Sequence, residues 1–324
     1  MKTSRRRFLL STAAGAVPIA VARPSAAAQR EPTRQQAASV EGDPLAYRRN
    51  WGRWGADDQM GAVNLITPAK RAEAAQLVKT GRVVSFGRPF EPEQQFVRVN
   101  QRGTGGSVVD YYGFMYHGVN VTHVDALCHV WDRNQMWNGR DPGKEIDTSG
   151  VRFADITAFA AGLVTRGVLL DVPRYRGVPF VTVDRPVEGA ELEAIAARQN
   201  VTVKPGDALL IYSGREAYVR ANGAYVGAPN PRPGLAASCA RYIRDRDVAV
   251  LGWDMHDALP EKNGLPWPGH GVVYSYGVAL VDNALLEPLA QACDEERRHE
   301  FMVMALPLKV PRGTGSPVNP IAMF

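Results

Sequence analysis

Residues 116–129, Y-H-G-V-N-V-T-H-V-D-A-L-C-H, contain three of the six histidines of this 324-residue chain and one aspartate. His123 and Asp125 are two residues apart, so on an extended backbone both side chains point to the same side. Asp125 and His129 are four residues apart and would share one face of a helical turn. We therefore expect a strand that runs into a helical turn and directs these three side chains at one point.

These residue types suit a metal. Neutral imidazole and carboxylate are ligands for zinc, manganese or non-haem iron. The alternative is a set of hydrogen-bonded histidines in a polar loop, and the spacing favours the metal site. His117 lies six residues before His123, and a straight strand would separate them by roughly 20 Å. His117 can join the site only if residues 118–122 loop back. Such a loop is possible because Gly118 and Asn120 tolerate a left-handed backbone conformation.

The stretch resembles the cyclase family of metal-dependent hydrolases, which includes bacterial kynurenine formamidase and isatin hydrolase. That family carries H-x-x-x-H-x-D-x-x-x-H, and His123, Asp125 and His129 match its second, third and fourth positions. Val119 stands at the first position. The form H-G-x-x-x-T-H-x-D-A-L-C-H is similar to that of a longer-chain branch, in which His117 would take the first role.

A second family motif lies near the C-terminus. The family has a histidine, a glycine seven residues later, and Glu-Asn twelve and thirteen residues later. His270, Gly277, Asp282 and Asn283 reproduce that spacing, with aspartate in place of glutamate. Taken alone, His270 could be a surface turn residue. With both motifs, the resemblance covers the chain from about residue 50 to its end.

The resemblance implies an α/β fold, a swivelling β/β/α domain with a central mixed sheet, as a homodimer. It implies hydrolysis of an amide or cyclic amide bond in a small molecule, an aromatic amide or lactam, as in tryptophan catabolism. The expected cofactor is a divalent metal, zinc or manganese. The implied site has one ion on His123, Asp125 and His270, a second on His117 and Asp282 with Asp125 bridging, and His129 as general acid/base.

Four further residues are candidates around this site. Trp131 and Trp137 could be core residues or could form the wall of an apolar pocket for an aromatic substrate. Asp254 resembles a family position beside the site, and we place it outside the ligand set. Cys128 as a nucleophile is a weaker hypothesis, because adjacent side chains such as those of Cys128 and His129 usually point apart.

The N-terminus predicts export. Residues 4–9, S-R-R-R-F-L, resemble a twin-arginine signal, and an apolar run and the small residues 26–28 follow. The alternative is a basic membrane anchor, but the run is short and is interrupted by Gly15 and Pro18. We expect a signal peptide over residues 1–28, a flexible lead-in over 29–42, and a periplasmic or secreted protein without a stable membrane anchor.

Removing residues 1–28 also changes the charge. Those residues hold five of the 38 basic residues and no acidic one, which leaves 33 basic against 33 acidic side chains. Binding to nucleic acid therefore has no support. Three cysteines cannot all pair, so at least one stays free.

The rest of the chain alternates strands and helices, which favours a single α/β domain over residues 43–324. We expect strands at 82–86, 108–114, 167–171, 207–212, 248–252 and 301–306. Helices are expected at 67–81, 189–199, 235–246 and 285–297. No glycine-rich nucleotide loop is present, so a nucleotide cofactor is not expected. The rival function is that of an exported metal-site protein that binds a small molecule without turnover.

The export hypothesis makes the first prediction. Arg5→Lys combined with Arg6→Lys should leave uncleaved precursor in the cytoplasm, because the arginine pair is the feature that the export route would read. Cell fractionation followed by mass measurement of the product tests this. Normal processing and normal periplasmic recovery of the double variant would contradict the twin-arginine assignment.

Overall fold

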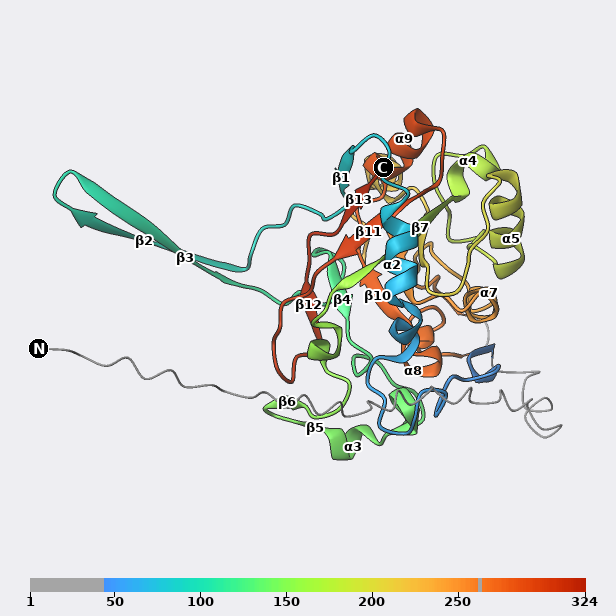
Figure 1. Ribbon diagram of the computed structural model, residues 1–324, viewed down its shortest axis with the longest axis horizontal. Coiled ribbons are helices and arrows are strands. Elements are labelled where there is room, and N and C mark those ends of the chain that lie inside the picture. Colours follow the sequence, from blue (N-terminus) through green and yellow to red (C-terminus); the bar gives the residue numbers. More distant parts are fainter. Residues whose placement is uncertain (1–43, 262–263) are drawn as a thin grey trace, which may run out of the picture.

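The computed structural model describes residues 44–261 and 264–324. The predicted signal peptide and lead-in lie outside these residues. A nine-stranded mixed sheet runs through the described chain, in the order β1-β13-β11-β7-β8-β9-β10-β4-β12 (Figure 1). The α/β prediction with a central mixed sheet is confirmed.

The strands of this sheet are β1 (Val83–Ser85), β4 (His123–Asp125), β7 (Leu163–Asp171), β8 (Ala208–Tyr212), β9 (Val250–Trp253), β10 (Ala279–Asp282), β11 (Glu300–Ala305), β12 (Gly315–Pro317) and β13 (Ile321–Met323). Two separate hairpins are formed by β2 (Gln94–Arg102) with β3 (Gly105–Gly113) and by β5 (Ile146–Asp147) with β6 (Gly150–Val151).

The helices are α2 (Pro68–Ala75), α3 (Pro142–Glu145), α4 (Val172–Arg176), α5 (Gly189–Arg198), α6 (Arg215–Asn222), α7 (Cys239–Asp245), α8 (Gly271–Tyr276) and α9 (Glu287–Glu296). Four short 3₁₀ helices accompany them: η1 (Pro44–Ala46), η2 (Gly61–Leu65), η3 (Trp137–Gly139) and η4 (Ile156–Phe159). Within the described chain, no helix has the length and apolar character needed to cross a membrane.

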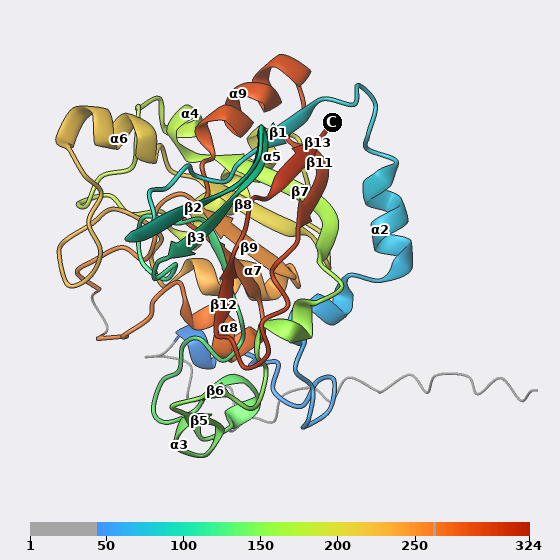
Figure 2. The same cartoon turned by 90° about the vertical axis from the view of Figure 1, so that its left-hand side faces the viewer.

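The centre of the sheet is parallel and fully buried. Strands β7, β8, β9 and β10 pair in parallel, and every residue of β8, β9 and β10 is buried. The sequences of such strands are continuous apolar runs, because both faces of each strand are covered. Helix α5 packs against α7 and α7 against α8, while α2 lies across β7 and β11 (Figures 1 and 2). The antiparallel strands β4 and β12 extend this rigid centre at one edge.

Two predicted helices are shorter than expected. Thr67 caps α2 through its side-chain oxygen, as the sequence predicts, but the helix ends at Ala75 and does not reach Gly81. The Gly81 amide instead donates to the carbonyl of the C-terminal Phe324. The helix expected from residue 235 begins only at Cys239, because Leu235 pairs in an extended conformation with Asp257.

Strand β2 was not predicted. Its sequence, Q-Q-F-V-R-V-N-Q-R, has no buried face, and its residues are all exposed or half-buried. Strand β3 matches the predicted strand at 108–114 but starts earlier, at Gly105.

A close contact between Gly61 and Gly277 fixes helix α8, which follows His270. The Ala62 amide donates to the Gly277 carbonyl at 2.7 Å, and both glycines have positive φ. A Cβ on Gly61 would overlap the Gly277 carbonyl oxygen, whereas a Cβ on Gly52, also at positive φ, would meet nothing within 4 Å.

We therefore expect Gly61→Ala to destabilise the fold more than Gly52→Ala does. Both variants carry the left-handed backbone cost of about 1–2 kcal/mol. Only Gly61→Ala adds overpacking, which costs about 1–3 kcal/mol more. Urea unfolding gives both free energies, and equal values for the two variants would contradict the proposed overlap.

Candidate metal centre

Strand β4 places two site residues on one side of the sheet. It lies between β10 and β12, and its residues His123, Val124 and Asp125 are all buried. In the antiparallel register with β10, His123 lies opposite Asp282. Directly opposed residues share a face of the sheet, so the imidazole and the two carboxylates meet on that face.

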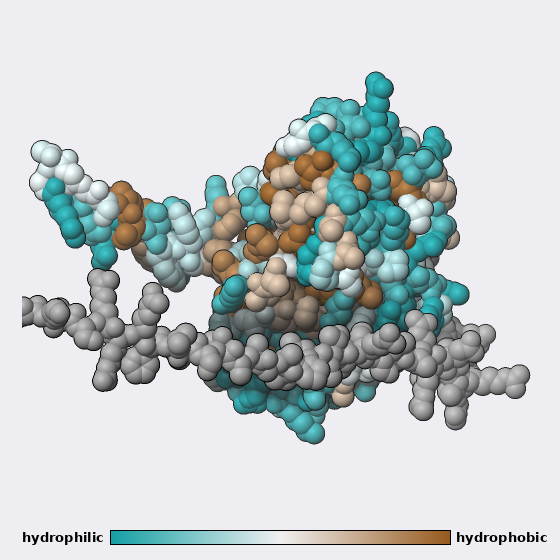
Figure 3. Space-filling view, viewed as in Figure 1, coloured by the Kyte–Doolittle hydropathy of each residue, from teal (hydrophilic) through white to brown (hydrophobic). Residues whose placement is uncertain are grey.

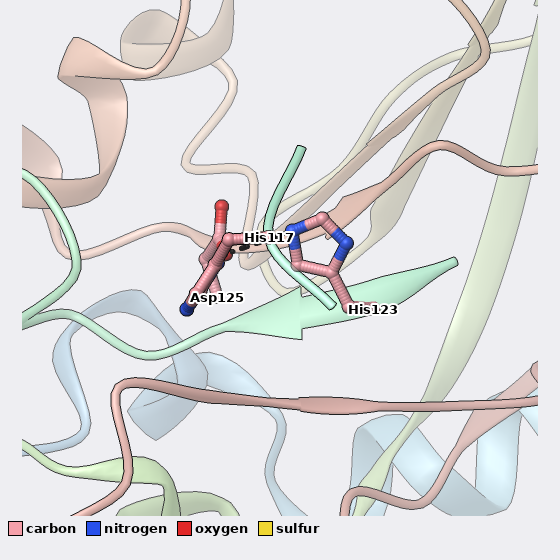
Figure 4. Close-up of side chains that lie close together, drawn as sticks. All are labelled: His117, His123 and Asp125. Carbon is pink, nitrogen blue, oxygen red and sulfur yellow. Dashed lines mark ion pairs between the residues drawn. The ribbon is translucent and has the colours of Figure 1, made fainter. Parts of the chain in front are cut away.

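His117, His123 and Asp125 form the first cluster (Figure 4). The Asp125 Oδ1 atom is 3.1 Å from His117 Nδ1 and 3.3 Å from His123 Nε2. Each of the three residues offers one ligand atom, and these atoms lie within 4.8 Å of one another. The loop after His117 therefore does turn back to the strand.

Two long-range side chains hold this loop. Asn283, directly after β10, donates from Nδ2 to the carbonyls of Gly118 and Val121. Arg215, at the start of α6, donates from Nη2 to the Val119 carbonyl at 2.5 Å. Both residues are buried. The position of His117 thus depends on contacts with residues about 100 and 165 positions away.

His256, His270 and Asp282 form a second cluster. His270 Nε2 is 3.5 Å from Asp282 Oδ2, and His256 Nε2 is 3.1 Å from Asp282 Oδ1. His123 Nε2 lies 3.8 Å from Asp282 Oδ2, so the two clusters adjoin. The residues of both family motifs come together in one buried centre.

Hydrogen bonding distinguishes His256 from the other imidazoles. The Nδ2 group of Asn283 donates to two backbone carbonyls, so its Oδ1 atom is the acceptor that faces Arg215 and His256. His256 Nε2 lies 2.7 Å from that oxygen and must donate to it. A nitrogen that carries this proton has no lone pair for a metal, so His256 supports the centre without being a good ligand.

Hydrogen bonds on the side away from the centre set the ring orientations of His123 and His270. His123 Nδ1 donates to the Val121 carbonyl at 2.8 Å, and His270 Nδ1 donates to the Asp257 carboxylate. Both Nε2 atoms therefore face the centre. A backbone carbonyl or carboxylate on the far nitrogen is the usual arrangement behind a metal-bound histidine.

The two central carboxylates differ in their partners. Asp282 Oδ1 accepts from the Trp253 indole at 2.5 Å and from the backbone amide of Asn283 at 2.7 Å. Its other oxygen, Oδ2, faces the imidazoles and receives neither of these hydrogen bonds. Asp125 is fully buried, and neither of its oxygens has a hydrogen-bond donor among the described residues. A buried carboxylate without donors costs several kcal/mol unless a cation balances it, so this donor set fits a divalent cation.

The electrostatics follow from these distances. Burial would lower the pKa of His123, but the carboxylates of Asp125 and Asp282 outweigh it and raise that pKa to about 9. The same attraction outweighs burial at Asp125 and Asp282, whose pKa values fall well below normal. A divalent cation would replace the imidazolium protons that balance the carboxylates in the metal-free centre.

His129 lies beside the first cluster rather than in it. Residues 126–129 form a single turn, not the predicted helix, closed by a hydrogen bond from the His129 amide to the Ala126 carbonyl. Its ring stacks on His117 at 3.8 Å between centroids, and its Nε2 is 3.8 Å from Asp125 Oδ1. Burial lowers the pKa of His129 to about 4, so this imidazole is neutral at neutral pH.

The two tryptophans have different surroundings. Trp137 is fully buried and donates to the Asp58 carbonyl at 2.8 Å, so it is a core residue and not a pocket wall. Trp131, two residues after His129, is 39% exposed and remains available to a ligand.

Cys128 and Asp254 have structural surroundings. Burial raises the pKa of the Cys128 thiol to about 12, which leaves it protonated and unsuited to nucleophilic attack. All three cysteines are free and buried. Asp254 accepts from the backbone amides of residues 213–215 at the start of α6, and so helps to place Arg215.

Arg215 and Asn283 were not predicted as site residues. Asn283 belongs to the second family motif, but the sequence did not indicate which contacts its side chain makes. Arg215 had no sequence signal, because a single arginine after a strand resembles any surface cation. In the structure Arg215 is only 6% exposed, and this burial identifies it as a residue of the centre.

Comparison with known proteins agrees with the sequence resemblance. The Cyclase family model matches residues 84–258, and no curated protein matches the chain significantly. A crystal structure described as that of a novel cyclase is 28% identical, with a TM-score of 0.74, and the match covers 85% of this chain and 99% of the other.

Two isatin hydrolase structures share the fold at lower identity. One, bound to the product analogue thioisatinate, is 15% identical with a TM-score of 0.51 and coverages of 76% and 93%. Isatin hydrolase A from Labrenzia aggregata, bound to benzyl benzoate, is 16% identical with a TM-score of 0.53 and coverages of 77% and 94%. The swivelling β/β/α architecture expected from the resemblance is confirmed. Because the family model matches more than half of the chain, this protein belongs to the Cyclase family.

Proposed function

We propose that this protein is a metal-dependent hydrolase that cleaves the C–N bond of an amide or cyclic amide. The observation that carries the proposal is the buried Asp125 carboxylate, which receives no hydrogen bond from the part of the chain that the structure describes and faces the imidazoles of His117 and His123. A structural carboxylate at this depth would be hydrogen-bonded. One that is kept bare among imidazoles is arranged for a cation.

The proposed ligands are the residues whose free lone pairs face the centre. They are His117, His123, Asp125, His270 and Asp282, and the last four are held by strands or by hydrogen bonds on the side away from the centre. A divalent ion there, zinc or manganese, would lower the pKa of a bound water and polarise the substrate carbonyl. The metal's identity and the number of ions belong to this proposal.

His129 is the proposed general acid/base. Its Nε2 atom is too far from Asp125 for a hydrogen bond, so the nitrogen is free to exchange a proton. A neutral imidazole can accept a proton from the attacking water and return it to the leaving nitrogen. Stacking on His117 keeps the ring beside the centre while it does so.

The substrate class follows from the relatives and from the residues at the rim. Isatin hydrolases with this fold act on an aromatic lactam, and Trp131 offers an exposed indole two residues after His129. We therefore propose a small aromatic amide or lactam as substrate, and a protein that works as a homodimer after export to the periplasm. Assays of isatin and an N-formyl arylamine with added zinc or manganese test the reaction.

The alternative is an exported protein that binds such a molecule at its metal without turnover. Binding seen by calorimetry, with no ring-opened or deformylated product after long incubation, would favour that alternative.

The ligand assignment predicts loss of metal in His123→Ala and in Asp125→Ala. Each change removes one ligand from a small shell, and such a shell tolerates little loss. The measurement is metal content by mass spectrometry after dialysis, with His299→Ala as the matched control because His299 lies outside both clusters. Stoichiometric metal in both site variants would refute the assignment.

The role of His129 predicts a different result for His129→Ala. Metal content should stay near that of the parent, while kcat should fall about 10²–10⁴-fold, the usual contribution of a positioned acid or base. Both quantities are measured on one preparation. A parallel loss of metal and activity would make His129 a ligand, and an unchanged kcat would remove it from the mechanism.

A further inference from the structure

A cavity lies at the end of β7, apart from the metal centre. Its volume is about 340 Å³, which is in the size range of sites that hold one small molecule. Residues of β7, α4, α5 and α9 line it, together with His299 just before β11. The five proposed metal ligands, all within the described chain, do not line it.

The cavity is at the same edge of the sheet as the metal centre, but three strands away. β7, β8, β9 and β10 are parallel neighbours, and Asp171 ends β7 as Asp282 ends β10. Because neighbouring strands are about 4.8 Å apart, three strand spacings separate these two ends by about 14 Å. Ligands of open α/β sheets bind at the carboxyl ends of parallel strands. The cavity thus has the position of a ligand site and is too far from the centre to share its ion.

Asp171 gives the cavity a negative charge that this chain does not balance. The residue is only 7% exposed, and its Oδ1 accepts from the backbone amide of Arg174 at 2.9 Å as the N-cap of α4. Within residues 44–261 and 264–324 the carboxylate receives no other hydrogen bond and forms no ion pair, because the Arg174 guanidinium pairs with Asp294. Burial raises the pKa of Asp171. A cationic group in the cavity would balance this carboxylate.

Two arginines supply positive charge around the same cavity. Arg198 is in the last turn of α5, and Arg297 caps α9 with a left-handed φ of 54°. Glycine is usual at such a cap, so the backbone alone does not explain this arginine. Both side chains are exposed and form no ion pair with the described part of the chain. A guanidinium with free N–H groups can bind a carboxylate through two parallel hydrogen bonds.

His299 and an apolar surface complete the wall. The Nδ1 atom of His299 is buried and has no hydrogen-bond partner among the described residues. Burial lowers the pKa of this imidazole, so the ring adds no charge at neutral pH. Ile195 and Cys293 are fully buried, and together with the half-buried ring of Tyr175 they give the cavity an apolar side.

The charges around the cavity define the kind of molecule that fits it. Arg174 and Asp294 neutralise each other, which leaves two arginines and one aspartate. A simple anion would meet the arginines but would be repelled by Asp171. A molecule with both a carboxylate and an ammonium group would satisfy all three. The surface over α9 and α4 is mostly hydrophilic (Figure 3), so it does not have the character of a docking site for an apolar protein surface.

We propose that the cavity at the end of β7 binds a free α-amino acid with an apolar side chain. The carboxylate would bind Arg198 and Arg297, and the ammonium group would bind the Asp171 oxygen that accepts no hydrogen bond. The apolar side chain would lie against Ile195 and Tyr175. This site is separate from the proposed hydrolase centre and does not depend on its ion.

Binding is measured by calorimetry and ligand-detected NMR on the full chain with excess EDTA, so that no ion in the metal centre can bind a carboxylate. L-leucine or L-phenylalanine should bind with a dissociation constant of about 1 mM or less. The same amino acid without its ammonium group, 4-methylpentanoate or 3-phenylpropanoate, should bind about 10-fold more weakly, as expected for one lost hydrogen bond to a charged group. The same loss is expected without the carboxylate, in 3-methylbutylamine or 2-phenylethylamine.

Two results of these titrations would overturn the proposal. One is the absence of binding by both amino acids at about 10 mM. The other is equal affinity for the amino acid and its carboxylate analogue, which would make the cavity a site for simple anions.

Asp171→Asn tests the ammonium contact. Asparagine is as good an N-cap as aspartate, so the variant should fold and melt like the parent. Its affinity for the amino acid should fall about 10-fold, whereas the carboxylate analogue should bind no more weakly, because the repulsion is removed. The control is Asp141→Asn, which changes the N-cap aspartate of α3, outside the cavity. An equal loss for both compounds in Asp171→Asn would refute the contact.

Arg198→Gln with Arg297→Gln tests the carboxylate contact. The double variant should bind the amino acid at least about 10-fold more weakly and should bind the amine analogue no more weakly. Arg102→Gln, which changes an exposed arginine at the end of β2, is the control. Parent-like affinity for the amino acid in both the Asp171 and the arginine variants would place binding elsewhere and overturn the proposal. Failure of the parent chain to bind zinc would count against the proposed function and would leave this site unaffected.

Discussion

The Asp125 carboxylate is the constraint on which this structure depends. It is completely buried on β4, and neither oxygen receives a hydrogen bond from the described residues. The Asp254 carboxylate is held differently, because three backbone amides at the start of α6 donate to it. The fold instead surrounds Asp125 with imidazoles and leaves its lone pairs open. In the metal-free protein the neighbouring imidazoles balance the charge of Asp125, and its oxygens remain open to a cation.

Hydrogen bonds around the ligand residues join two halves of the centre that are distant in sequence. Asn283 contacts the loop after His117 through its amide nitrogen, and contacts Arg215 and His256 through its amide oxygen. It adopts φ 55°, a left-handed conformation that asparagine tolerates better than most residues. One side chain therefore fixes the loop, the arginine and the supporting histidine together. These contacts give a structural reason for an asparagine directly after Asp282.

The sequence predicted the parts of the centre that depend on local geometry. His123 and Asp125 share a side because a strand has a period of two, and that follows from spacing alone. His117 was uncertain because its position depends on Asn283 and Arg215, which no local pattern connects to it. The strands β8, β9 and β11 and the helices α5 and α9 were predicted within a few residues, since their apolar periods are strong, but the buried strand β10 and the buried helix α8 were not predicted. The ends of α2 and α7 were wrong, because contacts with Phe324 and Asp257 outweighed local helix signals. Strand β2 was not predicted, because it has no buried face and therefore shows no alternation of apolar and polar residues.

The division between strands and loops also explains how the centre can bind and react. His123, Asp125 and Asp282 stand on paired strands, where backbone ladders limit their movement. His117 and His129 stand on a loop and a turn, and their rings stack on each other at the exposed side. Sites on strands are held more precisely than sites on loops. The rigid half therefore suits the ion, which needs fixed distances, whereas the loop half suits proton exchange and substrate entry, which need small movements.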